Sequence, residues 1–219
     1  MLGLPDDLGR SAARPLRLLG LGAHPDDLEI GAGGTVLRLL SERPHTVVRW
    51  GVLTGAGTPR EAEAQEAAAA FLGRAASWDV EVAGFQDGFL PYIGAAVKET
   101  FEQRLKPFDP HLVLTHRRDD RHQDHRLVSD LTWNTFRGEA RIAEYEIPKW
   151  DGGSAEANAY VRLDAGTARR KVDLLGAHFE SQHAKAWYDD ETFRGLLRLR
   201  GVECAARFAE AFVCRKLTW

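Results

Sequence analysis

Residues 24–27 read His-Pro-Asp-Asp and directly follow an apolar run, residues 18–23, that is typical of a buried strand. An imidazole and two carboxylates therefore share one turn at the edge of the predicted core. Taking such groups out of water costs free energy unless an opposite charge compensates for it, and a divalent metal ion would supply that charge. The turn is a candidate metal site.

A second cluster of the same residue types occurs far downstream. Residues 122–125 read His-Gln-Asp-His and come after another apolar run, residues 112–115. Ligands of a parallel α/β sheet gather beyond the carboxyl ends of its strands. Because both clusters follow strand candidates, the sequence predicts that they meet at one sheet edge and form a composite metal site.

A catalytic zinc ion takes three protein ligands of nitrogen or oxygen type and keeps one position open. His24 and Asp27 belong to one turn and can reach the same ion, and His125 can supply the third ligand. Asp26 would then lie beside the ion as a base for water. The same donors also accept Fe²⁺, Co²⁺ or Mn²⁺.

The remaining polar residues of the second cluster are candidates for catalysis. His122 precedes His125 by one helical turn, so it would face the same cavity and could stabilise an oxyanion or donate a proton. Asp124 could accept a hydrogen bond from an imidazole, which fixes the tautomer of the ring and raises its pKa.

Strand and helix candidates alternate along the chain. Strand candidates cover residues 17–23, 46–53, 78–82, 111–115, 142–147 and 160–163, and helix candidates cover residues 33–42, 60–72, 94–106, 122–136, 165–179, 190–199 and 202–206. This alternation predicts a single-domain, Rossmann-like α/β fold, with a doubly wound and mostly parallel sheet that carries helices on both faces. A length of 219 residues suits one domain of this kind.

The composition excludes several classes of protein. A net charge of -3 gives no electrostatic reason to expect a nucleic-acid partner or an anionic membrane surface. No apolar run approaches the roughly 20 residues of a membrane-spanning helix. Residues 1–15 have no apolar signal-peptide core and are interpreted as a loose polar lead-in. Cys204 and Cys214 form no CxxC pair, so we expect reduced thiols and a cytoplasmic location.

The first cluster, with its flanking residues 23–31 and with Gly33, Gly34 and Thr35 behind it, resembles the first signature of the PIG-L/LmbE-like zinc-dependent N-acetylglucosaminyl deacetylases. The second cluster is similar to the HPDH signature of that family, with Gln123 in place of the usual proline. Looser similarities follow in family order at residues 60–73, 85–88, 145–148, 171, 178–182 and 209–212. The resemblance covers nearly the whole chain from residue 17 and implies one deacetylase domain over residues 16–219.

The resemblance implies hydrolysis of an N-acetyl group on an N-acetylglucosamine-type amino-sugar conjugate, which releases acetate and a free amine. The substrate partner would thus be a small molecule, and the sequence indicates no oligomeric state. The implied site residues are His24, Asp27 and His125 as zinc ligands, Asp26 as general base, His122 and Asp124 as catalytic residues, and Arg60 and Asp87 as substrate contacts.

Simpler interpretations exist for each of these residues. Asp26 or Asp27 could cap the following helix, although a cap would not explain the histidine. The second cluster follows a charged run, residues 117–121, and its histidines could be exposed. Arg60 could be a surface residue of an alanine-rich helix, and Asp87 an ordinary turn residue before Gly88.

Two other functions also remain compatible with the ligand set. One is a metal-dependent amidase for a non-sugar N-acyl substrate, and the other is a non-catalytic α/β module that binds a metal. A dinucleotide site is disfavoured, because the glycines between residues 20 and 34 do not follow the GxGxxG spacing. The two aspartates would also place negative charge where a pyrophosphate needs N–H donors.

Overall fold

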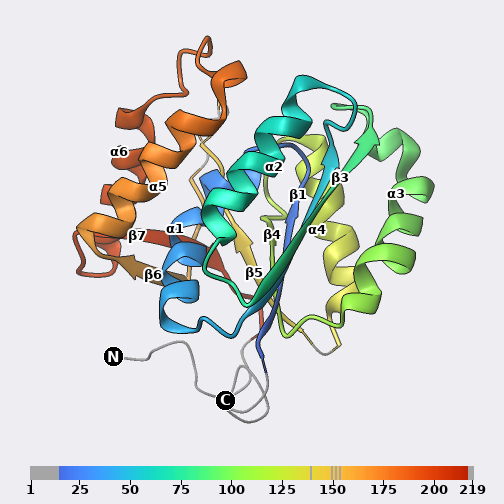
Figure 1. The fold of residues 1–219 in the computed structure, drawn as a ribbon, viewed down its shortest axis with the longest axis horizontal. Helices are drawn as coiled ribbons and strands as arrows, with labels where there is room; N and C mark the ends of the chain where they lie inside the picture. The colour runs from blue at the N-terminus through green and yellow to red at the C-terminus, as the bar shows by residue number, and fades with distance from the viewer. Residues whose placement is uncertain (1–14, 139, 149, 151, 153, 217–219) are drawn as a thin grey trace.

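A seven-stranded sheet runs through the molecule and carries helices on both of its faces (Figure 1). The computed structural model describes residues 15–138, 140–148, 150, 152 and 154–216. The predicted lead-in therefore lies outside the described residues, apart from Pro15. Within the described part, the chain forms a single α/β domain, as the alternation of elements predicts.

The sheet is doubly wound and mostly parallel. Its strands are β1 (Arg17–Gly22), β2 (Val47–Thr54), β3 (Ser77–Phe85), β4 (Leu112–His116), β5 (Arg141–Tyr145), β6 (Ala159–Leu163) and β7 (Phe208–Val213). They lie in the order β3-β2-β1-β4-β5-β7-β6. The first five are parallel, whereas β7 runs antiparallel to both β5 and β6. The strand order reverses between β1 and β4, which is the position where such sheets bind ligands.

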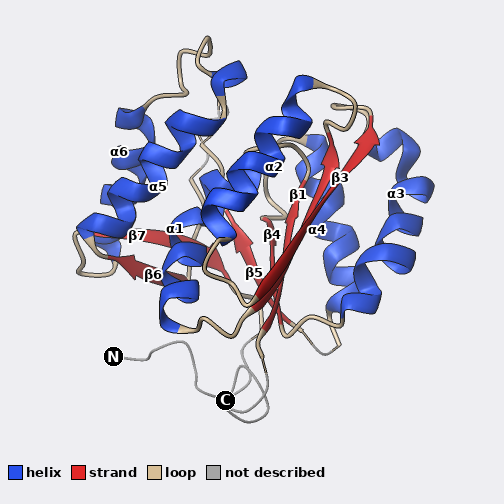
Figure 2. Ribbon diagram, viewed as in Figure 1, coloured by secondary structure: helices blue, strands red, loops and turns tan. Residues whose placement is uncertain are grey.

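Helices cover the two faces of the sheet unequally (Figure 2). One face carries α1 (Asp27–Glu42), α2 (Pro59–Leu72), α5 (Ala165–His178) and α6 (Asp190–Glu203), and the other carries α3 (Gly94–Thr100) and α4 (Gln123–Phe136). Each face has its own apolar core. Short helical turns occur at Leu90–Ile93, Phe101–Leu105, Lys106–Phe108 and Glu180–Gln182. No helix among the described residues is both long and apolar enough to cross a bilayer.

Two elements differ from the prediction. Helix α1 begins at Asp27 rather than at residue 33, because its glycines are packing positions and do not delay the helix: a Cβ on Gly33 would lie 2.5 Å from Cε1 of Phe71. At the other end of the chain, the two predicted C-terminal helices are one helix, α6, and the antiparallel strand β7 follows it. The buried Glu210 in the middle of β7 interrupts the apolar run by which a buried strand is recognised in the sequence.

Glu210 pairs with Lys171 of α5 inside the core, at an Oε1–Nζ distance of 2.6 Å. Its carboxylate also accepts the backbone N–H groups of Gly34 (2.8 Å) and Thr35 (2.6 Å) in α1. The Lys171 ammonium donates to the Ile30 carbonyl at 2.5 Å. The buried ion pair thus adds hydrogen bonds to the backbone of α1 and ties this helix to α5 and β7.

Replacing Gly31 with alanine is expected to destabilise the fold. The new Cβ would lie 2.1 Å from Cδ2 of Tyr145, a buried ring whose hydroxyl donates to the Leu21 carbonyl at 2.7 Å. Overpacking typically costs about 1–3 kcal/mol, and this contact is tight, so we expect about 3 kcal/mol less free energy of unfolding in urea titrations. Gly195→Ala in α6 is the control, because nothing lies within 4 Å of its added Cβ, and we expect it to stabilise by up to about 1 kcal/mol. Equal effects of the two substitutions would contradict the close packing at Gly31.

Candidate metal centre

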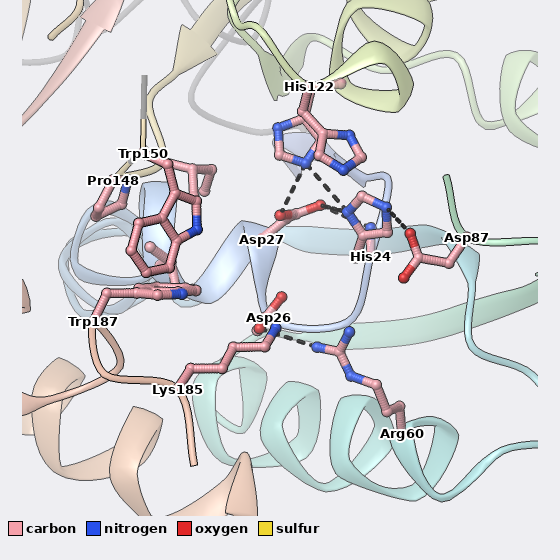
Figure 3. A pocket seen from close by; sticks show the side chains of 13 residues that line it. His24, Asp26, Asp27, Arg60, Asp87, His122, Pro148, Trp150, Lys185 and Trp187 are labelled. Atoms are coloured by element: carbon pink, nitrogen blue, oxygen red, sulfur yellow. Dashed lines mark hydrogen bonds and ion pairs between the residues drawn. The ribbon is translucent and has the colours of Figure 1, made fainter. Parts of the chain in front are cut away.

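The carboxyl end of β1, the first turn of α1 and the first turn of α4 bring His24, Asp27 and His125 together. Figure 3 shows His24 and Asp27 side by side, with His122 above them. His24 Nδ1 lies 3.3 Å from Asp27 Oδ2 and 3.2 Å from His125 Nε2. His125 Nε2 lies 3.5 Å from Asp27 Oδ1. All three residues are buried. The two predicted clusters therefore form one group of nitrogen and oxygen donors.

The spacing of these atoms suits a divalent ion. In a tetrahedral zinc site with bonds of about 2.0–2.1 Å, neighbouring ligand atoms lie about 3.3 Å apart. The distances from His24 Nδ1 to His125 Nε2 and to Asp27 Oδ2 are close to that separation, and His125 Nε2 meets the other oxygen of the same carboxylate. Two histidines and one carboxylate leave a fourth position open, which is the composition of a catalytic site rather than a structural one.

The backbone turn between β1 and α1 fixes the first cluster. The carboxylate of Asp27 accepts the backbone N–H of His24 at 2.7 Å and so closes the turn. Asp26 adopts a left-handed conformation, with φ 101°, which is uncommon for a residue other than glycine. Its side chain makes no capping hydrogen bond to α1. Helix capping therefore does not account for Asp26, and its strained backbone is typical of functional turns.

Carboxylates behind the two imidazoles set the orientation of the rings. Asp120 Oδ2 lies 3.0 Å from His125 Nδ1, so that Nε2 of the same ring faces the group. On His24, Asp87 Oδ1 and Asp124 Oδ2 contact Nε2, at 2.9 and 3.2 Å, and Nδ1 faces the group. Such contacts fix the tautomer and increase the basicity of a ligating histidine.

Asp120 is absent from the sequence-based prediction. It belongs to the charged run that precedes the second cluster, where the neighbouring Asp119 is exposed and Asp120 is buried. Asp120 also accepts the backbone N–H of His122 at 2.7 Å and thereby shapes the start of α4. No sequence pattern separates these two aspartates, because only the folded turn decides which of them points inward.

Asp124 contacts the imidazole of His24. Its carboxylate lies against His24, and its backbone N–H donates to His122 Nδ1 at 3.3 Å. The same carboxylate accepts the N–H groups of Gly88 (2.7 Å) and Leu90 (3.1 Å). Asp124 is therefore fully buried and holds the loop that carries Asp87 beside His24.

His116, the last residue of β4, also belongs to the cluster and is missed by sequence reasoning. Its ring stacks on that of His125 with centroids 3.8 Å apart. Its Nε2 lies 3.1 Å from Asp27 Oδ2, 3.1 Å from the Ala23 nitrogen and 3.2 Å from the Tyr145 hydroxyl. His116 thus lies against Asp27, and with Asp27 and His125 it forms a further compatible donor group, whose ligand atoms lie within 4.8 Å of one another. Its place at the end of a strand, at the same sheet edge, is the signal that could have revealed it.

Asp26 and Arg60 both line the cavity and form an ion pair (Figure 3). Arg60 Nη2 lies 3.0 Å from Asp26 Oδ2 and also donates to the Pro25 carbonyl. Burial raises the pKa of Asp26 to about 7, although the positive charge of Arg60 opposes the rise. A carboxylate with such a pKa can both accept and release a proton near neutral pH.

These residues surround a cavity of about 390 Å³. All of the predicted site residues except Asp124 line it, including His122, whose ring centroid lies 4.8 Å from that of His24. The sequence-based prediction missed the opposite wall. That wall consists of Ile147, Pro148, Trp150, Lys185 and Trp187. These residues come from two loops whose fold is not encoded in a short motif.

The fold and this cluster define an α/β protein with a potential metal centre at the strand-order switch point. Residues 19–136 match the family PIG-L, described as GlcNAc-PI de-N-acetylase, and this match spans more than half of the chain. The protein belongs to the PIG-L family. Among curated proteins, no significant sequence match is found.

Solved structures with the same fold cover nearly the whole chain. A conserved protein from Thermus thermophilus has a TM-score of 0.72 at 24% identity and covers 93% of this chain and 96% of its own. The N,N'-diacetylchitobiose deacetylase from Pyrococcus horikoshii, in complex with an inhibitor, has a TM-score of 0.71 at 18% identity and covers 94% of this chain and 88% of its own. The 4-carboxy-2-hydroxymuconate hydratase from Pseudomonas putida has a TM-score of 0.72 at 14% identity and covers 93% of this chain and 98% of its own. At these identities, the likeness establishes the fold.

Replacing Asp120 with asparagine is expected to weaken metal binding about 10- to 100-fold, which is typical when a carboxylate behind a ligating histidine is lost. Asp120 contacts His125 Nδ1 with one carboxylate oxygen and accepts the His122 N–H with the other. Asparagine has a single accepting oxygen, so it cannot keep both hydrogen bonds. Competition with a chromophoric chelator measures the affinity for Zn²⁺. The exposed neighbour offers a matched control, Asp119→Asn, which should bind the metal as the wild type does. Unchanged affinity in Asp120→Asn would contradict its role in orienting His125.

Proposed function

We propose that this protein is a metal-dependent hydrolase that removes an N-acetyl group from an N-acetylglucosamine-type amino-sugar conjugate. Membership of the PIG-L family supports the reaction class, and the chitobiose deacetylase shares the fold. The observation that carries the proposal is the buried triangle of His24, Asp27 and His125 with the carboxylate of Asp26 beside it. A non-catalytic module would not need a second buried carboxylate, Asp26, beside its ligands and facing the cavity.

His24, Asp27 and His125 would hold the ion, with Zn²⁺ as the first choice and Fe²⁺, Co²⁺ or Mn²⁺ as alternatives. When bound, the ion supplies Lewis-acid polarisation of the amide carbonyl and lowers the pKa of water in the open position. The chain's own residues then have to move protons and stabilise charge.

Asp26 is the proposed general base. It lines the cavity next to Asp27, and burial places its pKa where proton acceptance from an attacking water is efficient. Arg60 pairs with this carboxylate and keeps it oriented. We therefore assign Arg60 a positioning role in addition to its proposed contact with substrate. His122 faces the same space from the start of α4 and would stabilise the oxyanion or protonate the leaving amine.

Asp124 would act through His24 by fixing the ring tautomer and by holding the loop of Asp87. Asp87 has an exposed side chain at the rim of the cavity, where its carboxylate can accept hydrogen bonds from sugar hydroxyl groups. The hydrogen bond from His24 lowers the pKa of Asp87, which keeps the carboxylate charged at neutral pH.

Asp26→Asn is expected to lower kcat about 10²- to 10⁴-fold, because the amide cannot accept the proton of the attacking water. Metal content should remain at the wild-type level, since Asp26 is not among the three proposed ligands. Acetate release and elemental analysis on the same preparation measure the two quantities. The exposed Asp173→Asn in α5 controls for the loss of one negative charge. Full activity of Asp26→Asn would overturn the assigned base.

The metal requirement and the substrate class can be tested in one acetate-release assay. We expect the purified protein to lose activity on treatment with a chelator and to regain it with Zn²⁺, or with Fe²⁺, Co²⁺ or Mn²⁺ if one of these is preferred. Conjugates of N-acetylglucosamine should be hydrolysed at least about tenfold more efficiently than simple N-acyl amides, because Asp87 and Arg60 can contact sugar hydroxyl groups. Equal efficiency would favour a general metal-dependent amidase, and activity that no metal restores would contradict the proposal.

A further inference from the structure

The cavity has an apolar wall that the proposed chemistry does not use. Pro148, Trp150 and Trp187 lie together on the side facing away from His24 and Asp87 (Figure 3). The side chain of Trp150 is 83% exposed, so it contributes little to the stability of the fold. An exposed indole at the mouth of a functional cavity is a surface available to a ligand.

Trp187 packs against an aromatic cluster. Its ring meets Tyr188 edge-on at a centroid distance of 5.4 Å and Phe193 at 6.4 Å. The Tyr188 hydroxyl donates to the Leu175 carbonyl at 3.2 Å, and the Tyr188 N–H closes a tight turn on the Lys185 carbonyl at 3.0 Å. A ligand that stacks on Trp187 therefore does not have to order it first.

A buried ion pair joins the two ends of the loop that carries Trp150. Glu146, just after β5, pairs with Arg200 of α6 through two contacts of 2.5 and 2.6 Å. The Ala155 N–H donates to Glu146 at 3.0 Å, and Arg200 donates to the Ala155 carbonyl at 3.0 Å. These contacts tie Glu146 to Ala155, whereas Trp150, which lies between them in the sequence, is exposed.

Lys185 adds a positive charge to this wall. Its side chain is exposed in the cavity, and its Nζ lies 5.8 Å from the ring centroid of Trp187. Among the ion pairs of the described residues, none joins Lys185 to a carboxylate within 4.0 Å, although its side chain extends toward Asp26, which Arg60 engages, and its charge acts on that carboxylate (Figure 3). Lys185 can therefore contact an acidic group that a ligand brings.

We propose that Trp150, Trp187 and Lys185 form a second subsite, which binds a ring bearing an acidic group on the amine side of the scissile amide. The assignment to the amine side rests on the proposed function, because an acetyl group ends in a methyl and leaves nothing on the acyl side to reach this wall. Indole faces stack on planar or pyranose rings, and a lysine forms charge-assisted hydrogen bonds with carboxylate or phosphate.

Binding to the metal-free protein, measured by calorimetry, tests the subsite without turnover. The probes are N-acetylglucosamine, its phenyl β-glycoside and its 4-carboxyphenyl β-glycoside. We expect the phenyl glycoside to bind about tenfold more tightly than the free sugar, and the carboxyphenyl glycoside to bind several-fold more tightly still. Trp150→Ala should remove most of the advantage of the ring. Lys185→Gln should remove only the advantage of the carboxylate.

Matched controls separate the subsite from general effects of substitution. Trp78→Ala on β3 removes another exposed tryptophan, which does not line the cavity, and Lys106→Gln removes an exposed lysine on the opposite face of the sheet. Both should leave all three affinities unchanged. Trp187→Phe retains the aromatic packing against Tyr188, and it should weaken binding of both glycosides even if Trp187→Ala unfolds.

Equal affinity of the three probes would overturn the proposal, as would a loss in Trp78→Ala equal to that in Trp150→Ala. In the metal-loaded protein, preference for an N-hexanoyl over an N-acetyl sugar that disappears in Trp150→Ala would assign the wall to the acyl chain and also overturn it. If the binding pattern holds but no probe releases acetate, the proposed function fails and the ring-binding subsite stands.

Discussion

The negative charge of Asp27, buried at the carboxyl edge of the sheet, is the constraint around which the site is built. Burial alone would raise the pKa of this carboxyl, but the imidazoles of His125, His116 and His24 outweigh it and hold the pKa well below its usual range. These histidines come from the end of β1, from β4 and from α4, so three elements converge on one carboxylate. The fold thereby places donors within ligand distance before any ion binds.

A second ring of carboxylates balances the imidazoles from outside. Asp120 lies behind His125, and Asp124 lies behind His24. Negative and positive groups thus alternate outward from Asp27, and each of these two imidazoles has one nitrogen directed inward and one directed outward. Each imidazole contacts Asp27 on one side or an outer carboxylate on the other, so removal of one residue leaves a buried charge or hydrogen-bond donor without compensation. The geometry of the centre is therefore a property of the network and not of three ligands alone.

Much of this arrangement is visible in the sequence, and the parts that are not have physical causes. The two His/Asp clusters and the alternation of elements identify the sheet edge, because strand ends and ligand types are local features. Strand β7 escapes detection since its central Glu210 looks incompatible with a core until Lys171 is seen beside it. Asp120 and His116 are missed because only the folded chain shows that their side chains are buried against the proposed ligands.

The apolar wall is the least predictable part of the site. Trp150 and Trp187 belong to irregular loops, and their positions depend on distant contacts such as the pairing of Glu146 with Arg200. Tryptophans in a sequence can equally be core residues, as Trp50 is here. Local patterns therefore locate the chemistry at the sheet edge, whereas long-range packing shapes the surface that a substrate meets.

The Lys171–Glu210 pair connects α1 to β7, the first helix and the last strand of the described residues. Until β7 docks, Gly34 and Thr35 have no carboxylate to receive their N–H groups, and Lys171 has no counter-charge. Residues 19–136 carry the family match and every proposed catalytic residue, yet they do not include Lys171 and Glu210, which bind the backbone of α1. During synthesis these contacts can form only after the later segment has been made, which links the packing of α1, where the proposed metal-binding turn begins, to the antiparallel part of the sheet.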